Sequence, residues 1–387
     1  MHTPQVFQRV LRQNAFLIVT ALIVLVAFLA PSIGANFYSI SWRPLIALLF
    51  ATSGLSLRLD EAVSALNAVN LHASIQFFSL LGTPFVFYLL FYTTGIAEMF
   101  LGSAELSIGT MAAMCMPTAA NTNIMFTTQA SGDVSLAIQA SAIGNVLGAF
   151  ISPIVAAVTI GGPVGEQNLW ATLLSLTQTI LAPLFIGILL QIGFRHWSPG
   201  LMAEGPMVWV KRSSSLVMLA ILYLLFCKTF SSANKLSLFE SVRLCVFIFI
   251  LHGVIVYAAW KCAHAASSVH ERRTAFILTA PQKTEAMGIA IIASIFRTSK
   301  GPNDNFAVMA FPIVVYHTVQ MMYGAVLVGL LQSETNASMR ENVDRDLPGY
   351  NSEAGKSDRH ENQFLPGIGP EDRDAATPLL NHMESSY

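Results

Sequence analysis

The chain has 387 residues, of which 54% are hydrophobic and only 11% are charged, and its mean hydropathy is +0.58. A soluble domain usually carries about 25% charged residues, so we expect a lipid bilayer to surround most of this chain. The formal net charge of −1 and the lack of a basic cluster argue against a nucleic-acid partner. The four cysteines lie in apolar runs without metal-ligand spacing, which predicts free thiols rather than a zinc site or a disulfide framework.

Ten apolar segments are candidates for transmembrane helices, since a helix needs roughly 20 apolar residues to cross the hydrocarbon core. They are 15–30, 44–57, 70–94, 99–130, 133–161, 169–194, 211–230, 240–262, 272–297 and 304–332. The first follows Arg9 and Arg12, as a signal peptide would, but without a convincing cleavage site we interpret it as a helix that remains. The pattern predicts an all-α polytopic membrane protein with ten transmembrane helices.

The basic residues between these segments predict the orientation of the chain. If residues 1–14 form a cytoplasmic N-terminus, nine lysines and arginines fall on the cytoplasmic side and six on the opposite side. Basic residues favour the cytoplasmic side of a membrane, so ten spans place both termini in the cytoplasm.

Residues 333–387 differ in composition from the rest of the chain. They contain eleven acidic and five basic residues and few apolar runs. Such a segment cannot bury enough apolar surface to order itself, so we expect a disordered acidic cytoplasmic tail.

Two of the apolar segments are interrupted in the same way, by a proline followed by polar side chains. The first interruption is CMPTAANTNIMFTTQ at 115–129 and the second is TAPQKTEAMGI at 279–289. Each belongs to the fourth span of a five-span half, 15–161 or 169–332, and an odd number of spans gives the halves opposite membrane orientations. Inverted repeats with broken helices at corresponding positions mark the midplane site of secondary transporters. The alternative is that each proline merely kinks a packed helix.

Short motifs spread over residues 10–332 occur in an order and spacing that are specific as a set. They are PSIG at 31–34, SGLSLRLDE at 53–61, IQFFSLLGTPF at 75–85, CMPTAANTNIM at 115–125, GNVLGAFISPI at 144–154, APLFIG at 182–187, TAPQKTEAMGI at 279–289 and FPIVVYHTVQMMYGAVL at 311–327. In this set the chain resembles the bile acid:sodium symporter family, specifically its sodium/bile acid cotransporter 7-like branch. The resemblance implies a panel bundle and a core bundle, in which broken spans four and nine cross as parts of a 5+5 inverted repeat.

Polar side chains of the first half could bind an ion or a substrate at the first break. They are Asn121, Thr122 and Asn123 after the break, Ser141 and Asn145 one turn apart on the next helix, and Gln76 in the third span. In sodium-coupled relatives, the resemblance implies that the positions of Gln76, Thr122, Asn123 and Ser141 hold sodium ligands. A further serine ligand is replaced here by Ala137.

The second break departs more strongly from the sodium-coupled pattern, which has a glutamate and, four residues later, a glutamine. If, as the resemblance implies, Lys283 takes the glutamine position, Thr279 takes the glutamate position and that acid is absent. Two adjacent cations in a medium of low dielectric constant repel each other, so we expect no coupling to two sodium ions. Lys283 is a built-in cation or, because burial favours the neutral amine, a proton carrier. Whether sodium or protons couple stays open at this point.

Other polar residues of the second break and the last span complete the candidate substrate or ion site: Gln282, Thr284, Glu285 and His317. Glu285 is the nearest partner for Lys283 if the break brings the two together, and Glu105 is a second candidate. His317 either shuttles protons or stays neutral in a hydrogen bond between helices, with Gln320 as its partner.

No enzyme motif or cofactor signature is present in the sequence, so we expect neither catalysis nor a cofactor. The favoured function is transport of a small organic anion, with a role in cellular calcium homeostasis that the resemblance implies. The alternative is a non-transporting regulator of calcium entry that acts through a membrane partner such as a calcium channel. Either protein would reside in the plasma membrane or in the secretory pathway.

Overall fold

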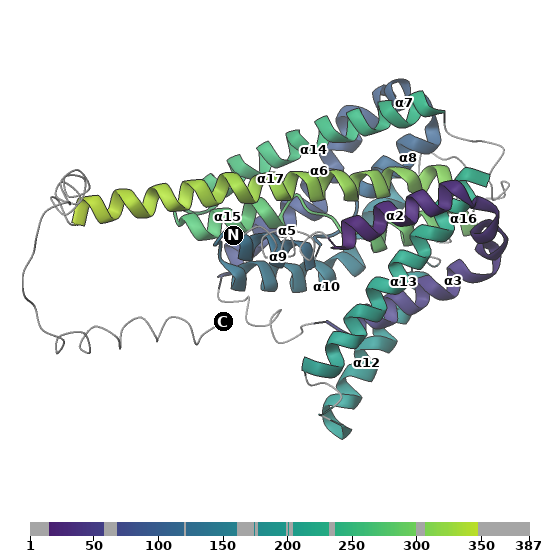
Figure 1. The fold of residues 1–387 in the computed structure, drawn as a ribbon, viewed down its shortest axis with the longest axis horizontal. Coiled ribbons are helices and arrows are strands. Elements are labelled where there is room, and N and C mark those ends of the chain that lie inside the picture. The colour runs from purple at the N-terminus through teal and green to yellow at the C-terminus, as the bar shows by residue number, and fades with distance from the viewer. Residues whose placement is uncertain are drawn as a thin grey trace, which may run out of the picture. The chain divides into compact units, whose positions relative to one another are not determined.

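The computed structural model describes residues 15–57, 68–119, 121–160, 174, 177–198, 200, 204–231, 237–298 and 306–346. The chain divides into two units, Met1–Ser333 and Glu334–Tyr387, and the helices discussed below belong to the first unless stated. Within the described ranges the regular secondary structure is helical (Figure 1).

Among the described residues, six helical stretches are long and apolar enough to cross a membrane. They are Val69–Tyr92, Val134–Thr159, Thr177–Trp197, Met207–Lys228, Leu238–Ala266 and Val308–Gln332. They coincide with the third, fifth, sixth, seventh, eighth and tenth predicted spans. Of the other four predicted spans, the fourth and ninth are each broken into shorter helices, and the first is the 15-residue helix Ala15–Leu29. The second contributes only the shorter apolar helix Pro44–Leu55.

Four helices of the two halves pack against one another. They are α2 (Ala15–Leu29), α3 (Pro31–Leu55), α12 (Ala182–Trp197) and α13 (Glu204–Ser231). Glycines allow α3 and α12 to approach closely: a Cβ atom on Gly54 would collide with the backbone of Leu184, and one on Gly187 would collide with the backbone of Ala51. Small residues permit the same close backbone contact in many membrane helix pairs. Helix α3 begins at Pro31, well before the predicted start of the second span at residue 44.

The third predicted span is one continuous rod whose hydrogen-bond pattern changes along its length. It consists of α5 (Val69–Phe77), the π-turn η2 (Phe78–Gly82), α6 (Thr83–Phe87) and the π-turn η3 (Tyr88–Tyr92). In η2 the backbone N–H of Thr83 donates to Phe78 O, five residues back, and the next residue is Pro84. π-turns inside α-helices are frequently found at functional sites.

The fourth and ninth predicted spans are broken, as expected. The first is divided into α7 (Ile96–Leu101), α8 (Ala104–Met114) and α9 (Asn121–Gln129), and the second into α15 (His270–Thr279) and α16 (Glu285–Thr298). Each break contains a proline, Pro117 or Pro281, whose ring and missing N–H prevent the helix from continuing. An additional break separates α7 from α8 at Gly102, whose φ of +81° favours glycine.

Three long helices accompany the broken ones: α10 (Val134–Thr159), α14 (Leu238–Ala266) and α17 (Phe306–Asp346). Figure 1 draws α14 and α17 side by side, and Tyr323 donates a hydrogen bond from its hydroxyl to Phe249 O at 3.1 Å between them. Helix α17 continues to Asp346, past the predicted end of the last span at residue 332. The rest of the predicted tail, 347–387, lies outside the described residues.

Candidate functional site

The two breaks lie against each other and pair through their backbones. Thr118 and Lys283 form an antiparallel bridge. Beside it, Ala119 N–H donates to Gln282 O at 3.1 Å and Thr284 N–H donates to Pro117 O at 3.0 Å. The prolines and the non-helical backbone take these groups out of helical hydrogen bonding. They are instead paired with each other, because buried N–H and C=O groups without a partner are costly.

The first break is held against α10 by two glycines and a serine. A Cβ atom on Gly144 would collide with the Thr118 hydroxyl, and one on Gly148 would collide with Pro117. One turn away, the Ser141 hydroxyl donates to Ala119 O at 3.0 Å. The GxxxG spacing therefore lets a non-helical segment lie directly on a helix, where a side chain would otherwise separate them.

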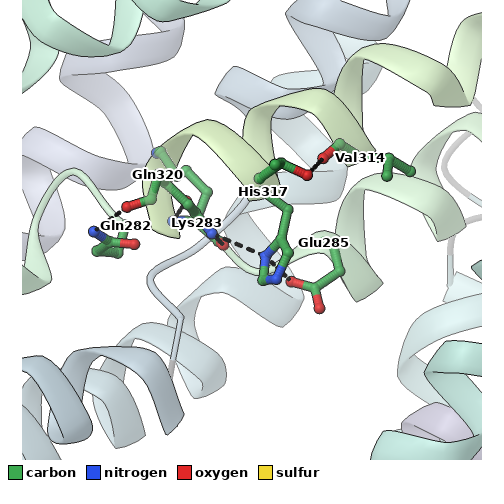
Figure 2. Close-up of polar contacts among 7 residues, drawn as sticks. Gln282, Lys283, Glu285, Val314, His317 and Gln320 are labelled. Atoms are coloured by element: carbon green, nitrogen blue, oxygen red, sulfur yellow. Dashed lines mark hydrogen bonds and ion pairs between the residues drawn. The ribbon is translucent and has the colours of Figure 1, made fainter. Parts of the chain in front are cut away.

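The second break is held by the side chain of Gln320 on α17. Its amide oxygen accepts a hydrogen bond from Lys283 N–H at 2.7 Å, and its amide nitrogen donates to Lys283 O at 2.7 Å. Its backbone oxygen accepts from the Gln282 side chain at 3.3 Å, as Figure 2 shows. A side-chain amide has both a donor and an acceptor. The Gln320 side chain therefore satisfies both backbone groups of Lys283, as a neighbouring β-strand would.

The carboxylate of Glu285 and the ring of His317 meet at the start of α16 and form an ion pair when the ring is protonated. The carboxylate oxygen Oε2 lies 3.0 Å from His317 Nδ1, and the side chains are only 14% and 8% exposed. Figure 2 shows the carboxylate facing the ring, and Gln320 Nε2 lies 3.1 Å from the same ring nitrogen. The predicted contact between His317 and Gln320 is therefore present. The predicted pairing of Glu285 with Lys283 is wrong, because α16 begins at Glu285 and directs its carboxylate to α17.

Lys283 reaches the third span and the end of α8. Its ammonium nitrogen Nζ donates to Ser79 O and lies 3.1 Å from Ser79 Oγ, 2.9 Å from Thr83 Oγ1 and 3.3 Å from Met114 O. We call these four atoms the oxygen cage. The whole residue is 0% exposed. Glu105, the second predicted partner, stands at the opposite end of α8, about 14 Å along the helix axis from Met114.

Two of the remaining candidate side chains of the first half contact α10. Asn123 donates to the Ser141 hydroxyl at 3.3 Å, and Gln76 donates to Ala140 O at 2.7 Å. Asn145 does not join them, since its amide donates to the backbone oxygen of Ser141 on its own helix at 2.9 Å. The side chain of Asn121 lies outside the described part of the structure.

Buried oxygen atoms remain without a hydrogen-bond partner around the crossing, as far as the structure describes it. They belong to Gln76 (Oε1), Thr118 (Oγ1), Thr122 (Oγ1), Asn123 (Oδ1), Thr279 (Oγ1) and Gln282 (Oε1). Buried polar atoms are normally satisfied, so such a set indicates a place where water, an ion or a polar group of a ligand completes the hydrogen bonds.

Four positions of the candidate site were missed by the sequence interpretation. Ser79 and Thr83 contact the Lys283 ammonium, and the Tyr316 hydroxyl donates to Pro281 O at 3.2 Å while lying 3.0 Å from His252 Nδ1. The only available sequence signal was the polar character of these side chains within apolar spans. That signal does not say which distant segment each would meet.

The chain was compared with known proteins. The sequence profile of the SBF-like CPA transporter family matches residues 14–333. Sodium/bile acid cotransporter 7 of Rattus norvegicus is 28% identical over 335 residues, which cover 83% of this chain and 93% of the rat protein. Sodium/bile acid cotransporter 7-B of Xenopus laevis is 27% identical, with 84% and 93% covered. The solute carrier RCH1 of Candida albicans is 24% identical, with 78% and 82% covered.

Proposed function

Because the chain belongs to the SBF-like CPA transporter family, we propose that the crossing of its two broken helices is the site at which it binds and moves a small organic anion. The chain is a multi-pass integral membrane protein of a transporter family. The observation that carries the proposal is the antiparallel pairing of the breaks at Thr118 and Lys283. Non-helical backbone at membrane depth is tolerated where it is buried in protein or lines a cavity, and paired broken helices form the site in inverted-repeat transporters.

The same pairing supports the predicted architecture of ten helices in a 5+5 inverted repeat. Two segments that run antiparallel at equivalent places of the halves are what an inverted repeat produces. The panel bundle would consist of α2, α3, α12 and α13, and the core bundle of the helices around the crossing. Transport would then proceed by movement of the core relative to the panel.

The anionic group of the substrate is best placed at the start of α9. This helix has no acidic residue in its first turn, so its N-terminal dipole is open to a negative group. The start of α16 is less suitable, since Glu285 occupies its first turn. The partnerless amide and hydroxyl oxygens would accept hydrogen bonds from hydroxyl groups of the substrate or from water.

Lys283 makes coupling to two sodium ions unfavourable, because its charge already occupies the crossing. We therefore expect uptake that does not require sodium. Purified protein in liposomes should accumulate members of a panel of radiolabelled organic anions that includes taurocholate, equally well when sodium is replaced by choline. The variant Lys283→Gln should lose at least about tenfold of this uptake, which corresponds to about 1.4 kcal/mol.

Gly193→Ala is the matched control, because Gly193 lies on α12 with no atom near its added methyl group. It should transport as the unmodified protein does. Uptake that depends steeply on sodium would contradict the role given to Lys283, and undiminished uptake by Lys283→Gln would place the substrate elsewhere.

We also propose that the protein resides in the plasma membrane or the secretory pathway. Both of its termini would then lie in the cytoplasm. The bias of nine against six basic residues supports the orientation. A glycosylation acceptor appended to either terminus should stay unmodified in cells. Modification of both would show the opposite orientation, and modification of one alone would contradict an even number of spans.

A role in cellular calcium homeostasis is the second part of the proposed function. It is supported by the resemblance of the chain and by the excess of acidic residues after the last span, eleven against five basic ones in 333–387. The alternative, a regulator that acts on a calcium-channel partner without transport, uses the same segment as its contact.

A further inference from the structure

Two carbonyl oxygens of the cage around Lys283, Ser79 O and Met114 O, lack a backbone donor from their own helix. In the π-turn η2, Thr83 N–H donates to Phe78 O rather than to Ser79 O. The next residue, Pro84, has no N–H, so Ser79 O has no backbone donor from its own helix. Met114 is the last residue of α8, where carbonyl groups lack helical partners and carry the negative end of the helix dipole. Three separate local features thus direct oxygen atoms to one point.

The hydrogen-bond inventory favours an ammonium over a neutral amine at this point, because three of the four cage atoms can only accept and the fourth, Ser79 Oγ, can accept or donate. Carbonyl oxygens of Ser79 and Met114 can only accept. The Thr83 hydroxyl donates its proton to Ser79 O at 3.0 Å, so toward Lys283 it can only accept as well. A neutral amine has two N–H donors for these three acceptors even when its lone pair accepts from the Ser79 hydroxyl, whereas –NH₃⁺ offers three donors.

We propose that the oxygen cage is a binding site for a monovalent cation and that the Lys283 ammonium is its permanent, covalently attached occupant. The four ligands are neutral and include no carboxylate, which suits a single positive charge better than the divalent ions that acidic ligands favour. Lys283 is 0% exposed and has no acidic partner in the cage. The dipoles of the four hydroxyl and carbonyl groups in the cage therefore stabilise its charge.

The cage gives the crossing a charge that never leaves during a transport cycle. Through the cage, Lys283 connects the second break to the third span and to α8, the helix that leads into the first break. For its role in coupling, this inference rests on the proposed transport function, because a fixed cation takes the place that a dissolved coupling cation would need. The binding property itself does not depend on transport and is tested without it.

The test removes the attached cation and supplies a free one. Thermal unfolding of the purified full-length protein in detergent is measured for the unmodified chain and for Lys283→Ala in n-butylammonium chloride, potassium chloride and choline chloride at equal ionic strength. n-Butanol, a neutral molecule of similar length, controls for simple filling of the space that the lysine leaves. We expect n-butylammonium to raise the melting temperature of Lys283→Ala by about 3 °C over choline, and n-butanol not to do so.

Two further variants keep the proposal falsifiable. Lys283→Ala combined with Thr83→Val removes one cage oxygen and should lose most of the response to n-butylammonium. Lys283→Met fills the volume without charge and should melt below the unmodified protein. An equal response to n-butanol, an equal response of the unmodified protein, or a full response of the double variant would overturn the cation site.

If Lys283→Ala does not yield folded protein, even when it is purified in n-butylammonium throughout, Lys283→Met alone tests the proposal. A Lys283→Met protein as stable as the unmodified one would overturn the proposal, and a lower melting temperature supports it. Neither result bears on the uptake assay, because no transported solute is present. Loss of the proposed transport function would likewise leave the cage as it is.

Discussion

Glu285 Oε2 and His317 Nδ1 lie 3.0 Å apart and both side chains are largely buried. Each side chain therefore supplies the polar partner that the other needs in the interior. Breaking such a pair by removing one partner costs about 3–5 kcal/mol, because the remaining charge stays in the interior without compensation. We therefore predict that Glu285→Leu and His317→Leu each lower the melting temperature of the purified protein clearly. The double variant should lose less than the sum of the two, because neither charge then remains.

Glu98→Leu provides the control for this cycle, since Glu98 is an exposed acid in α7 and its replacement should change the melting temperature little. Strictly additive losses in the double variant would show that Glu285 and His317 do not act as a pair. The four proteins of the cycle are compared in one detergent and at one pH.

At the scale of the helices, the contact between α3 and α12 depends on the absence of side chains at two positions. A Cβ atom on Gly187 would collide with the backbone of Ala51, and backbone atoms cannot turn aside as a side chain can. We predict that Gly187→Leu separates the two helices and lowers both the yield of folded protein and its melting temperature. Overpacking typically costs about 1–3 kcal/mol even where side chains can adjust.

Gly193 lies on the same helix with no heavy atom within 4 Å of an added Cβ, so Gly193→Leu tests the substitution itself without the collision. Its melting temperature should stay close to that of the unmodified protein. If both leucine variants melt alike, the close approach of α3 and α12 does not contribute to stability.

The breaks could be predicted from the sequence because their causes are local. Pro117 and Pro281 lie among polar residues inside apolar runs, and a proline ends a helix through its own ring and missing N–H. The partners of the breaks could not be predicted in the same way. Gln320 lies 37 residues from Lys283 and Ser79 lies 204 residues from it, and polar character alone does not indicate which distant segment a side chain meets.

The same contrast explains the errors at helix boundaries. Pro44 sits inside α3, so an apolar run that seemed to start at residue 44 is the second part of a longer helix. Likewise the π-turn η2 left only one trace in the sequence, Pro84, which removes a backbone donor but does not by itself specify a change of hydrogen-bond register. The separation of Glu285 from Lys283 followed from where α16 begins, which spacing along the chain does not fix.

At the scale of the whole molecule, the segment after α17 distinguishes the two proposed functions. Residues 347–387 carry seven acidic and three basic residues and follow the last described helix. Deleting them leaves every residue of the crossing and the oxygen cage in place. A transporter should therefore keep its solute uptake in liposomes, while a regulator that uses this segment to contact a channel partner should lose its effect on calcium entry in cells.

We predict that the truncated protein retains uptake within about twofold of the full chain, because the proposed substrate site lies on α8, α9, α15, α16 and α17 before residue 333. Calcium entry is measured with a fluorescent indicator in cells that express either form at equal levels. A second truncated protein that also carries Lys283→Gln distinguishes the two functions further. It should lose uptake, and it should not restore any effect on calcium entry that the truncation removed. Uptake that disappears with the tail alone would contradict the placement of the site within the crossing.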